Sequence, residues 1–192
     1  MIIGITGGTG CGKTTLLNVI AEKGGLVLDC DAIYHQLLIR DDHLLNTIGQ
    51  RFPGTVENGQ LLRKKLGSIV FADKNALEDL NRITHGAVKA EVLRQLETRP
   101  RLAAIDAIAL FEGGLAELCD TTVAVTAPVE DRVRRLMLRD SISEDYARNR
   151  IAAQHSEDWF RQHCDCILEN NGTQVQFREK CVAFLENLDI MD

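Results

Sequence analysis

The sequence lacks the features that would place it in a membrane or on nucleic acid. It has no run of some 18 apolar residues and no basic segment followed by an apolar one at its start. We therefore expect a cytoplasmic protein without membrane association. Its formal net charge is −6, so it also lacks the basic surface that nonspecific nucleic-acid binding requires. Positive charge for phosphate binding must consequently be concentrated locally.

The sequence also lacks paired cysteine motifs. Its six cysteines are scattered, and no CxxC pair occurs. The one cluster is Cys164-x-Cys166 beside His163, and strand alternation would place both thiols on one face. Buried, reduced core cysteines are the interpretation we favour, with a metal site at this cluster as the alternative.

The composition fits a single globular α/β domain over residues 1–192. The chain is 45% hydrophobic and has only three prolines. Short apolar runs of strand length alternate with helical patterns, as expected for parallel strands covered on both faces. Pro128, Ser143, Ser156 and the capping box Thr173-x-x-Gln176 mark helix starts. The predicted strands are 1–6, 26–29, 102–108, 121–126 and 164–168.

More than seventy residues separate the second and third predicted strands, and their pattern is nearly all helical. A simple crossover needs about a dozen. We expect residues 31–100 to be a helical insertion that forms an acceptor-binding wall beside a nucleotide site.

The segment Gly7-Gly8-Thr9-Gly10-Cys11-Gly12-Lys13-Thr14 fits the pattern G-x-x-x-x-G-K-[ST]. It follows the first strand and opens a helix, which is the setting of a phosphate-binding loop. Glycines let successive backbone N–H groups surround a polyphosphate, and the helix N-terminus adds partial positive charge. We predict ATP binding, with Lys13 at the β- and γ-phosphates and Thr14 on Mg²⁺; a glycine-rich turn that binds nothing is the alternative. The predicted loop residues are Gly8, Thr9, Gly10, Cys11, Gly12, Lys13, Thr14 and Thr15.

Acidic residues follow the second and third predicted strands, where an open parallel sheet collects its ligands. Asp31 is the candidate catalytic carboxylate, with capping of the helix from Ala32 as a compatible alternative. Asp106 is the candidate indirect Mg²⁺ ligand, although it could simply end a strand.

Five arginines follow the fourth predicted strand, the first three at helical spacing on one predicted helix and the other two on the next. We interpret residues of about 138–160 as a helical lid whose guanidinium groups stabilise the transferring phosphoryl group. A solvated face paired with acidic neighbours is the alternative for some of them. We expect Arg139 to be functional and Arg132 to be structural. The five are Arg132, Arg135, Arg139, Arg148 and Arg150.

Taken together, these motifs resemble the dephospho-coenzyme A kinase family. The resemblance runs nearly end to end, and the distal motifs are more selective than the phosphate loop. The matching segments are Thr6-Gly7-Gly8 with the rest of the loop, Asp29-Cys30-Asp31, Leu80-Asn81-x-x-x-His85, Asp106 before Leu110-Phe111-Glu112, Arg135-Leu136-x-x-Arg139-Asp140, Arg150-Ile151-x-x-Gln154 and Asn170-Asn171-Gly172.

The resemblance implies a three-layer P-loop NTPase fold with a five-stranded parallel sheet. It implies ATP-dependent, Mg²⁺-assisted phosphorylation of the ribose 3′-hydroxyl of dephospho-CoA, the last step of coenzyme A synthesis, by a monomer or weak homo-oligomer. Carried over by position, Asp31 is the base, Lys13 and Arg139 stabilise the phosphoryl group, and Thr6 and His85 line the acceptor side. For His85, a hydrogen-bonded residue at a helix end is an equal alternative.

The chain departs from the family pattern at two places on the acceptor side. Gly86 and Ile108 stand where the family usually has proline, which frees φ and restores a backbone N–H. We interpret both as drift. The competing hypotheses are another small-molecule kinase, acting on a nucleoside, a nucleoside monophosphate or shikimate, and a GTP-driven switch. The switch would need an Asn/Thr-Lys-x-Asp segment after a strand, and the sequence has none.

Overall fold

The computed structural model describes residues 1–188, and within them five parallel strands form one sheet in the order β2-β5-β1-β6-β7. The strands are β1 (Ile2–Thr6), β2 (Leu26–Asp29), β5 (Ala103–Asp106), β6 (Thr121–Thr126) and β7 (Cys166–Glu169). The predicted α/β class and five-stranded parallel sheet are therefore confirmed, although the last four residues of the predicted domain lie outside the described range. The last strand begins two residues later than predicted, so Cys164 ends a helix and shares no strand face with Cys166.

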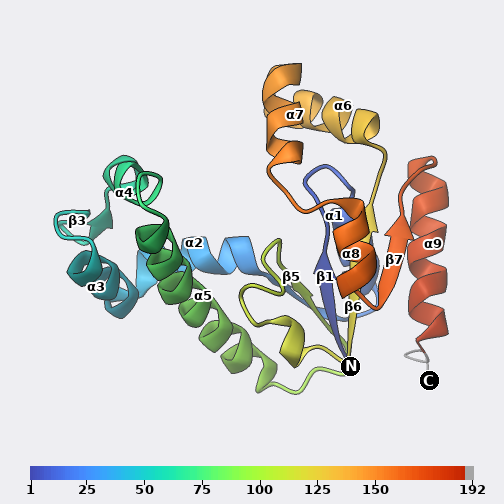
Figure 1. Ribbon diagram of the computed structural model, residues 1–192. Coiled ribbons are helices and arrows are strands. Elements are labelled where there is room, and N and C mark those ends of the chain that lie inside the picture. The colour runs from blue at the N-terminus through green and yellow to red at the C-terminus, as the bar shows by residue number, and fades with distance from the viewer. Residues whose placement is uncertain (189–192) are drawn as a thin grey trace.

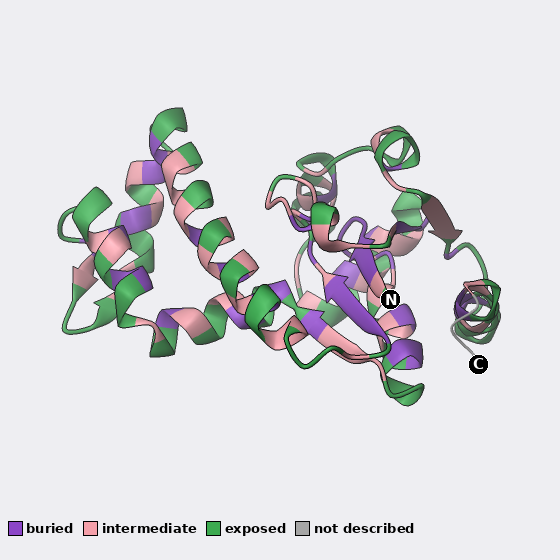
Figure 2. Cartoon of the chain, turned by 90° about the horizontal axis from the view of Figure 1, so that it is seen from below, coloured by how far each residue is buried: buried purple, intermediate pink, exposed green. Residues whose placement is uncertain are grey.

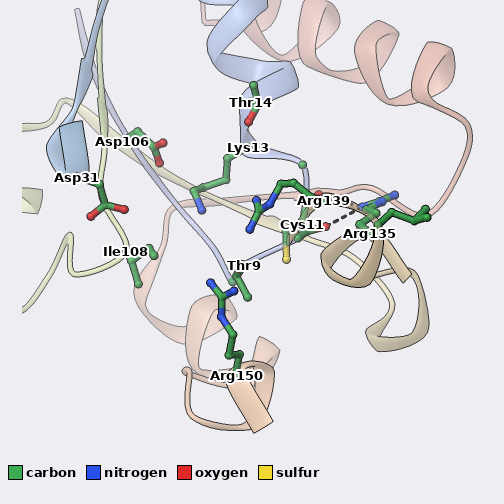
Figure 3. A pocket seen from close by; sticks show the side chains of 14 residues that line it. Thr9, Cys11, Lys13, Thr14, Asp31, Asp106, Ile108, Arg135, Arg139 and Arg150 are labelled. Carbon is green, nitrogen blue, oxygen red and sulfur yellow. Dashed lines mark hydrogen bonds between the residues drawn. The ribbon is translucent and has the colours of Figure 1, made fainter. Parts of the chain in front are cut away.

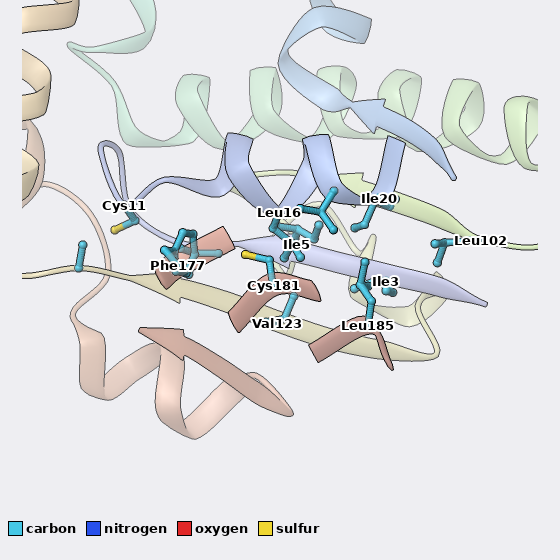
Figure 4. Close-up of a cluster of buried hydrophobic side chains, with 14 residues drawn as sticks. Ile3, Ile5, Cys11, Leu16, Ile20, Leu102, Val123, Phe177, Cys181 and Leu185 are labelled. Carbon is cyan, nitrogen blue, oxygen red and sulfur yellow. The ribbon is translucent and has the colours of Figure 1, made fainter. Parts of the chain in front are cut away.

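Helices cover the sheet on both faces. On one face, α1 (Lys13–Glu22) and α9 (Gln174–Asn187) pack against alternate residues of β1 such as Ile3 and Ile5 (Figure 4). The other face is covered by α5 (Lys74–Leu96), the start of α2 (Cys30–Arg40) and the segment 107–119, which includes the short helix η1 (Ala116–Leu118). On this face a side chain at Gly4 would come within 2.8 Å of Cys119 Sγ, so the glycine allows the 107–119 segment to approach.

Two helical bodies lie beside the sheet, and the first shares α2 and α5 with the layer that covers it (Figure 1). The first holds α2, α3 (Asp42–Arg51), α4 (Arg63–Val70) and α5 around its own core, in which Ile48 and Phe52 are buried. Outside that core its helices are largely exposed (Figure 2). The second body pairs α6 (Val129–Asp140) with α7 (Glu144–Ala152), and α8 (Glu157–His163) then returns the chain to β7.

The first body also contains a hairpin that the helical pattern of this stretch did not predict. Strands β3 (Val56–Glu57) and β4 (Gln60–Leu61) pair through Asn58 and Gly59, which both have positive φ. Asn-Gly is the strongest local signal for such a two-residue turn. The predicted helix caps are confirmed at Ser143, Ser156 and the Thr173 capping box. Among the described helices none is long and apolar enough to cross a membrane.

We predict that Leu185→Ala destabilises the protein by about 2–5 kcal/mol, because Leu185 is 1% exposed where α9 meets the sheet. Val175→Ala on the same helix is the matched control: Val175 is 67% exposed, so the change should stay within about 0.5 kcal/mol. Urea denaturation measures both. Equal effects of the two substitutions would contradict the assigned packing face.

Candidate functional site

A cavity of about 640 Å³ opens at the carboxyl edge of the sheet, between the phosphate loop and the pair α6 and α7 (Figure 3). In this view Asp31 and Asp106 lie on one side, Arg139 and Arg150 on the other, and Lys13 between them. The cavity brings together every predicted loop residue except Thr15, which is the third residue of α1. It is lined by Gly8, Thr9, Gly10, Cys11, Gly12, Lys13, Thr14, Asp31, Asp106, Ile108, Arg135, Leu138, Arg139 and Arg150.

The phosphate loop owes its shape to glycines with positive φ. Gly7, Gly10 and Gly12 have φ of 128°, 78° and 99°, values that other residues rarely adopt. Gly12 stands directly before α1, so the free N–H groups of the helix N-terminus face the cavity. Lys13 curls back over the loop, and its Nζ donates to the Gly7 carbonyl at 3.0 Å.

The two acidic residues after β2 have different roles in the structure. Asp29 caps α2, since its Oδ1 accepts a hydrogen bond from the Ala32 N–H at 2.9 Å. The alternative that Asp31 is the cap is therefore wrong. The chain enters the helix at Cys30, so 29 and 31 are not consecutive outward positions of an extended strand. Asp31 lies in the first helical turn, exposed, with its side chain on the cavity wall.

Asp106 ends β5 beside Lys13, and it is the most perturbed carboxyl in the cavity. Burial raises its pKa to about 6; Lys13 opposes the rise, and the negative charges of Asp29 and Asp31 add to it. Its Oδ1 is buried and has no hydrogen-bond partner among the described residues. A buried carboxylate oxygen without a partner, beside a phosphate loop, fits an oxygen-seeking cation such as Mg²⁺.

Arg139 and Arg150 are held by one carboxylate. Arg139 donates to both oxygens of Asp140 at 2.7 and 3.0 Å, and Arg150 donates to Oδ2 at 2.7 Å. Hydrogen bonds and charge from the two arginines, Arg139 foremost, lower the pKa of Asp140 to about 2. The pair α6–α7 has its own buried core, made by Val133, Leu136, Ala147 and Ile151.

The other predicted arginines separate into two groups. Arg132 and Arg135 donate to carbonyls of the phosphate loop, at Thr9 and Gly10 respectively. Arg148 instead pairs with Glu130 and Glu144 at the surface, which is the alternative expected for some of these residues.

A second cavity, of about 260 Å³, adjoins the first between α2, α5 and the 107–115 segment. Asp31 and Ile108 line both cavities. His85 lines the second from the middle of α5, so the alternative of a helix-end histidine is wrong. Its lining is Cys30, Asp31, Tyr34, Leu80, Asn81, Thr84, His85, Val88, Ala107, Ile108, Ala109, Gly113 and Leu115.

Two residues lie differently from what their predicted roles suggest. Thr6 is only 1% exposed and lines neither of these two cavities; its hydroxyl donates to the Ile108 carbonyl at 3.4 Å. Gly86, one of the departures from the family pattern, faces a groove on the other side of α5. Of the two departures, Ile108 is therefore the one at the site.

Sequence reasoning missed Asp140 and Gln154 as parts of the site, although both belong to motifs that carry the family resemblance. Asp140 joins two arginines because Ser141, with φ of 53°, turns the chain between α6 and α7. Gln154 accepts a hydrogen bond from the Thr9 N–H at 2.8 Å, across 145 residues of sequence. A helical spacing predicts only neighbours on the same helix. The Asp140–Arg150 and Gln154–Thr9 contacts each join residues of different elements.

Comparison with known proteins gives a consistent result. A family model described as dephospho-CoA kinase matches residues 1–176. A dephospho-CoA kinase of Bacillus licheniformis is 33% identical over 179 residues, covering 90% of this chain and 89% of its own. Dephospho-CoA kinase CAB5 of Saccharomyces cerevisiae is 32% identical, covering 98% and 83%.

Solved structures agree with these matches. The TT1252 protein of Thermus thermophilus has a TM-score of 0.82 at 32% identity, covering 98% of this chain and 97% of that one. Dephospho-CoA kinase of Campylobacter jejuni has a TM-score of 0.68 at 26% identity, covering 97% and 96%. A shikimate kinase of Bacteroides thetaiotaomicron, at 16% identity and a TM-score of 0.58, shares the fold.

We predict that the stability of the nucleotide-free protein depends on the ionisation of Asp106. Its folded pKa of about 6 exceeds the ordinary carboxyl value, so the wild type loses stability as pH rises from about 4 through 6. Asp106→Asn removes this loss. The free energy of unfolding of the variant minus that of the wild type should therefore be about 2–3 kcal/mol larger at pH 8 than at pH 4. Urea denaturation across this range measures it; parallel curves for the two proteins would contradict the shift.

Proposed function

The chain belongs to the dephospho-CoA kinase family, whose members phosphorylate dephospho-CoA with ATP to give coenzyme A. On that premise we propose which substrate each of the two cavities binds and which side chains act in the transfer. The observation that carries the proposal is that Asp31 lies on the shared wall of the two cavities. A phosphoryl donor in one and an acceptor hydroxyl in the other would meet beside a carboxylate.

The larger cavity is the ATP site in this proposal. Amides of the loop, among them those of Gly10 and Gly12, and the N-terminus of α1 surround the β- and γ-phosphates, and Lys13 exchanges the Gly7 carbonyl for phosphate oxygens. Mg²⁺ would neutralise charge on these phosphates, with the Thr14 hydroxyl as a direct ligand and Asp106 acting through water. Residues 1–188 contain no cluster of three or more His, Cys, Asp or Glu suited to a metal, which suits a cation held mainly by phosphates and water.

The smaller cavity takes the acceptor. Its apolar walls suit a nucleoside ring, and the polar groups of Asn81, Thr84 and His85 supply hydrogen bonds for orientation. The ribose 3′-hydroxyl would then lie at Asp31, which accepts its proton or orients it for in-line attack without a phosphoenzyme. Thr6 contributes indirectly, by holding the Ile108 carbonyl.

Lys13 and Arg139 stabilise the negative charge that develops on the transferring phosphoryl group. Residues of about 138–160 act as the lid, which carries Arg139 and excludes water. Residues 31–100 are the acceptor-binding subdomain. We also infer a cytoplasmic monomer or weak homo-oligomer that binds no nucleic acid. The shikimate-kinase alternative has only the shared fold in its favour.

An ADP-release assay with ATP and Mg²⁺ tests the acceptor. Dephospho-CoA is compared with adenosine, cytidine monophosphate and shikimate at equal concentrations. We expect turnover with dephospho-CoA alone and coenzyme A as the product. Turnover with another acceptor alone would keep the kinase chemistry and refute the assignment of the smaller cavity, pointing to Ile108 as the residue that changed specificity.

Asp31→Asn should reduce kcat by about 10²- to 10⁴-fold, because the amide keeps the size of the side chain but cannot accept the proton. The KM for ATP should change little, since Asp31 touches the acceptor hydroxyl. Steady-state kinetics separate the two constants. Asp42→Asn is a matched control, since Asp42 is an exposed first-turn residue of α3 outside both cavities. Undiminished kcat in Asp31→Asn would remove Asp31 from the mechanism.

A further inference from the structure

The peptide group on each side of Thr9 is held from outside the phosphate loop. The Thr9 N–H donates to Gln154 Oε1 at 2.8 Å, and the Thr9 carbonyl accepts from Arg132 Nε at 2.9 Å. Arg132 Nη2 also donates to Gln154 Oε1 at 3.0 Å. These three hydrogen bonds close a ring that joins the loop, α6 and the turn after α7. Thr9 itself is 8% exposed, and Arg132 and Gln154 are half-buried.

The same arrangement continues along the loop. The carbonyl of Gly10 accepts from Arg135 Nη1 at 3.0 Å, and that of Cys11 from Asn170 Nδ2 at 2.8 Å. Three consecutive carbonyls therefore accept hydrogen bonds from side chains of other elements. In a planar trans peptide the C=O of one residue and the N–H of the following residue point in opposite directions. The N–H groups that follow these carbonyls, those of Gly10, Cys11 and Gly12, therefore point away from the side-chain donors. Gly10 and Gly12 line the cavity, and the Cys11 N–H closes a turn with the Gly8 carbonyl at 3.3 Å.

Gly8 shows how closely the ring is packed. Its φ is not in the left-handed range, so backbone conformation does not require glycine here. A Cβ at this position would instead lie 2.1 Å from Arg132 Nη2 and 3.1 Å from Gln154 Oε1. The absence of a side chain at Gly8 is what allows the guanidinium and the amide to reach Thr9.

Gln154 is the member of the ring that comes from the lid side. It stands two residues after α7, and its own N–H bonds to the Ile151 carbonyl at 3.2 Å, on the helix that carries Arg150 into the cavity. Its side-chain oxygen accepts from a backbone amide and from a guanidinium at once. Movement of α7 is thereby tied to the orientation of the loop.

We infer that Gln154 is a positioning residue for ATP: together with Arg132 it sets the Thr9 peptide, and through it the loop amides, before the triphosphate arrives. This rests on the proposed ATP site in the larger cavity. A loop that is already arranged binds ground state and transition state alike, so loss of the ring weakens ATP binding and leaves the chemical step intact.

The test compares Gln154→Met with Gln154→Glu. Methionine keeps the length but removes the acceptor, and we expect the KM for ATP to rise about tenfold, with kcat and the KM for dephospho-CoA changed less than about threefold. Glutamate keeps an acceptor oxygen for both donors and should restore the KM for ATP to within about threefold of wild type. Gln162→Met, an exposed glutamine on α8, is the matched control and should leave all constants unchanged.

Arg132→Met tests the ring from its other side. It should raise the KM for ATP similarly, and the double variant with Gln154→Met should be little worse than either single one, because both break the same ring. An unchanged KM for ATP in Gln154→Met, or equal rises in both KM values, would overturn the inference.

Calorimetric titration with a nonhydrolysable ATP analogue and Mg²⁺ needs no acceptor. It therefore measures the contribution of Gln154 to ATP binding even if dephospho-CoA proves to be the wrong substrate.

Discussion

A backbone that offers its N–H groups to a ligand must find partners for its carbonyls elsewhere, and much of this structure follows from that constraint. A glycine-rich loop has no side chains to meet the need. Here α6 and the segment after β7 supply donors from outside the loop, with Arg135 and Asn170 as examples. The neighbouring elements are thus held around the end of β1 by hydrogen bonds to the loop carbonyls as well as by their apolar packing.

Charge is arranged on the same principle of local compensation. The chain is acidic overall, yet its cavity gathers arginines on one side and keeps a carboxyl with a raised pKa on the other. Asp140 compensates two guanidinium groups that line the cavity. Asp106, buried next to Lys13, stands where a cation would relieve the cost of its negative charge. Both carboxyls suit a site whose ligand brings anions and a cation together.

Local sequence signals predicted the fold well, because apolar runs of strand length, helix caps and the phosphate loop are each recognisable from a few consecutive residues. The capping box at Thr173 and the serine caps were of this kind. The predicted position of the helix cap at the end of β2 was wrong by two residues. Asp29 and Asp31 are equally good N-cap residues, and only the point where the strand ends decides which of them caps the helix. The contacts of Gln154 and Thr6 could not be predicted, because they join segments over a hundred residues apart.

The separate core of α6 and α7 has a consequence for how this protein can change over time. Four buried side chains hold these helices to each other, and none of the four belongs to the core cluster of the sheet. Substitutions there change the packing of this pair and leave the core cluster of the sheet untouched. The packing of this helix pair and the stability of the sheet can therefore evolve through different sets of residues, with little conflict between them.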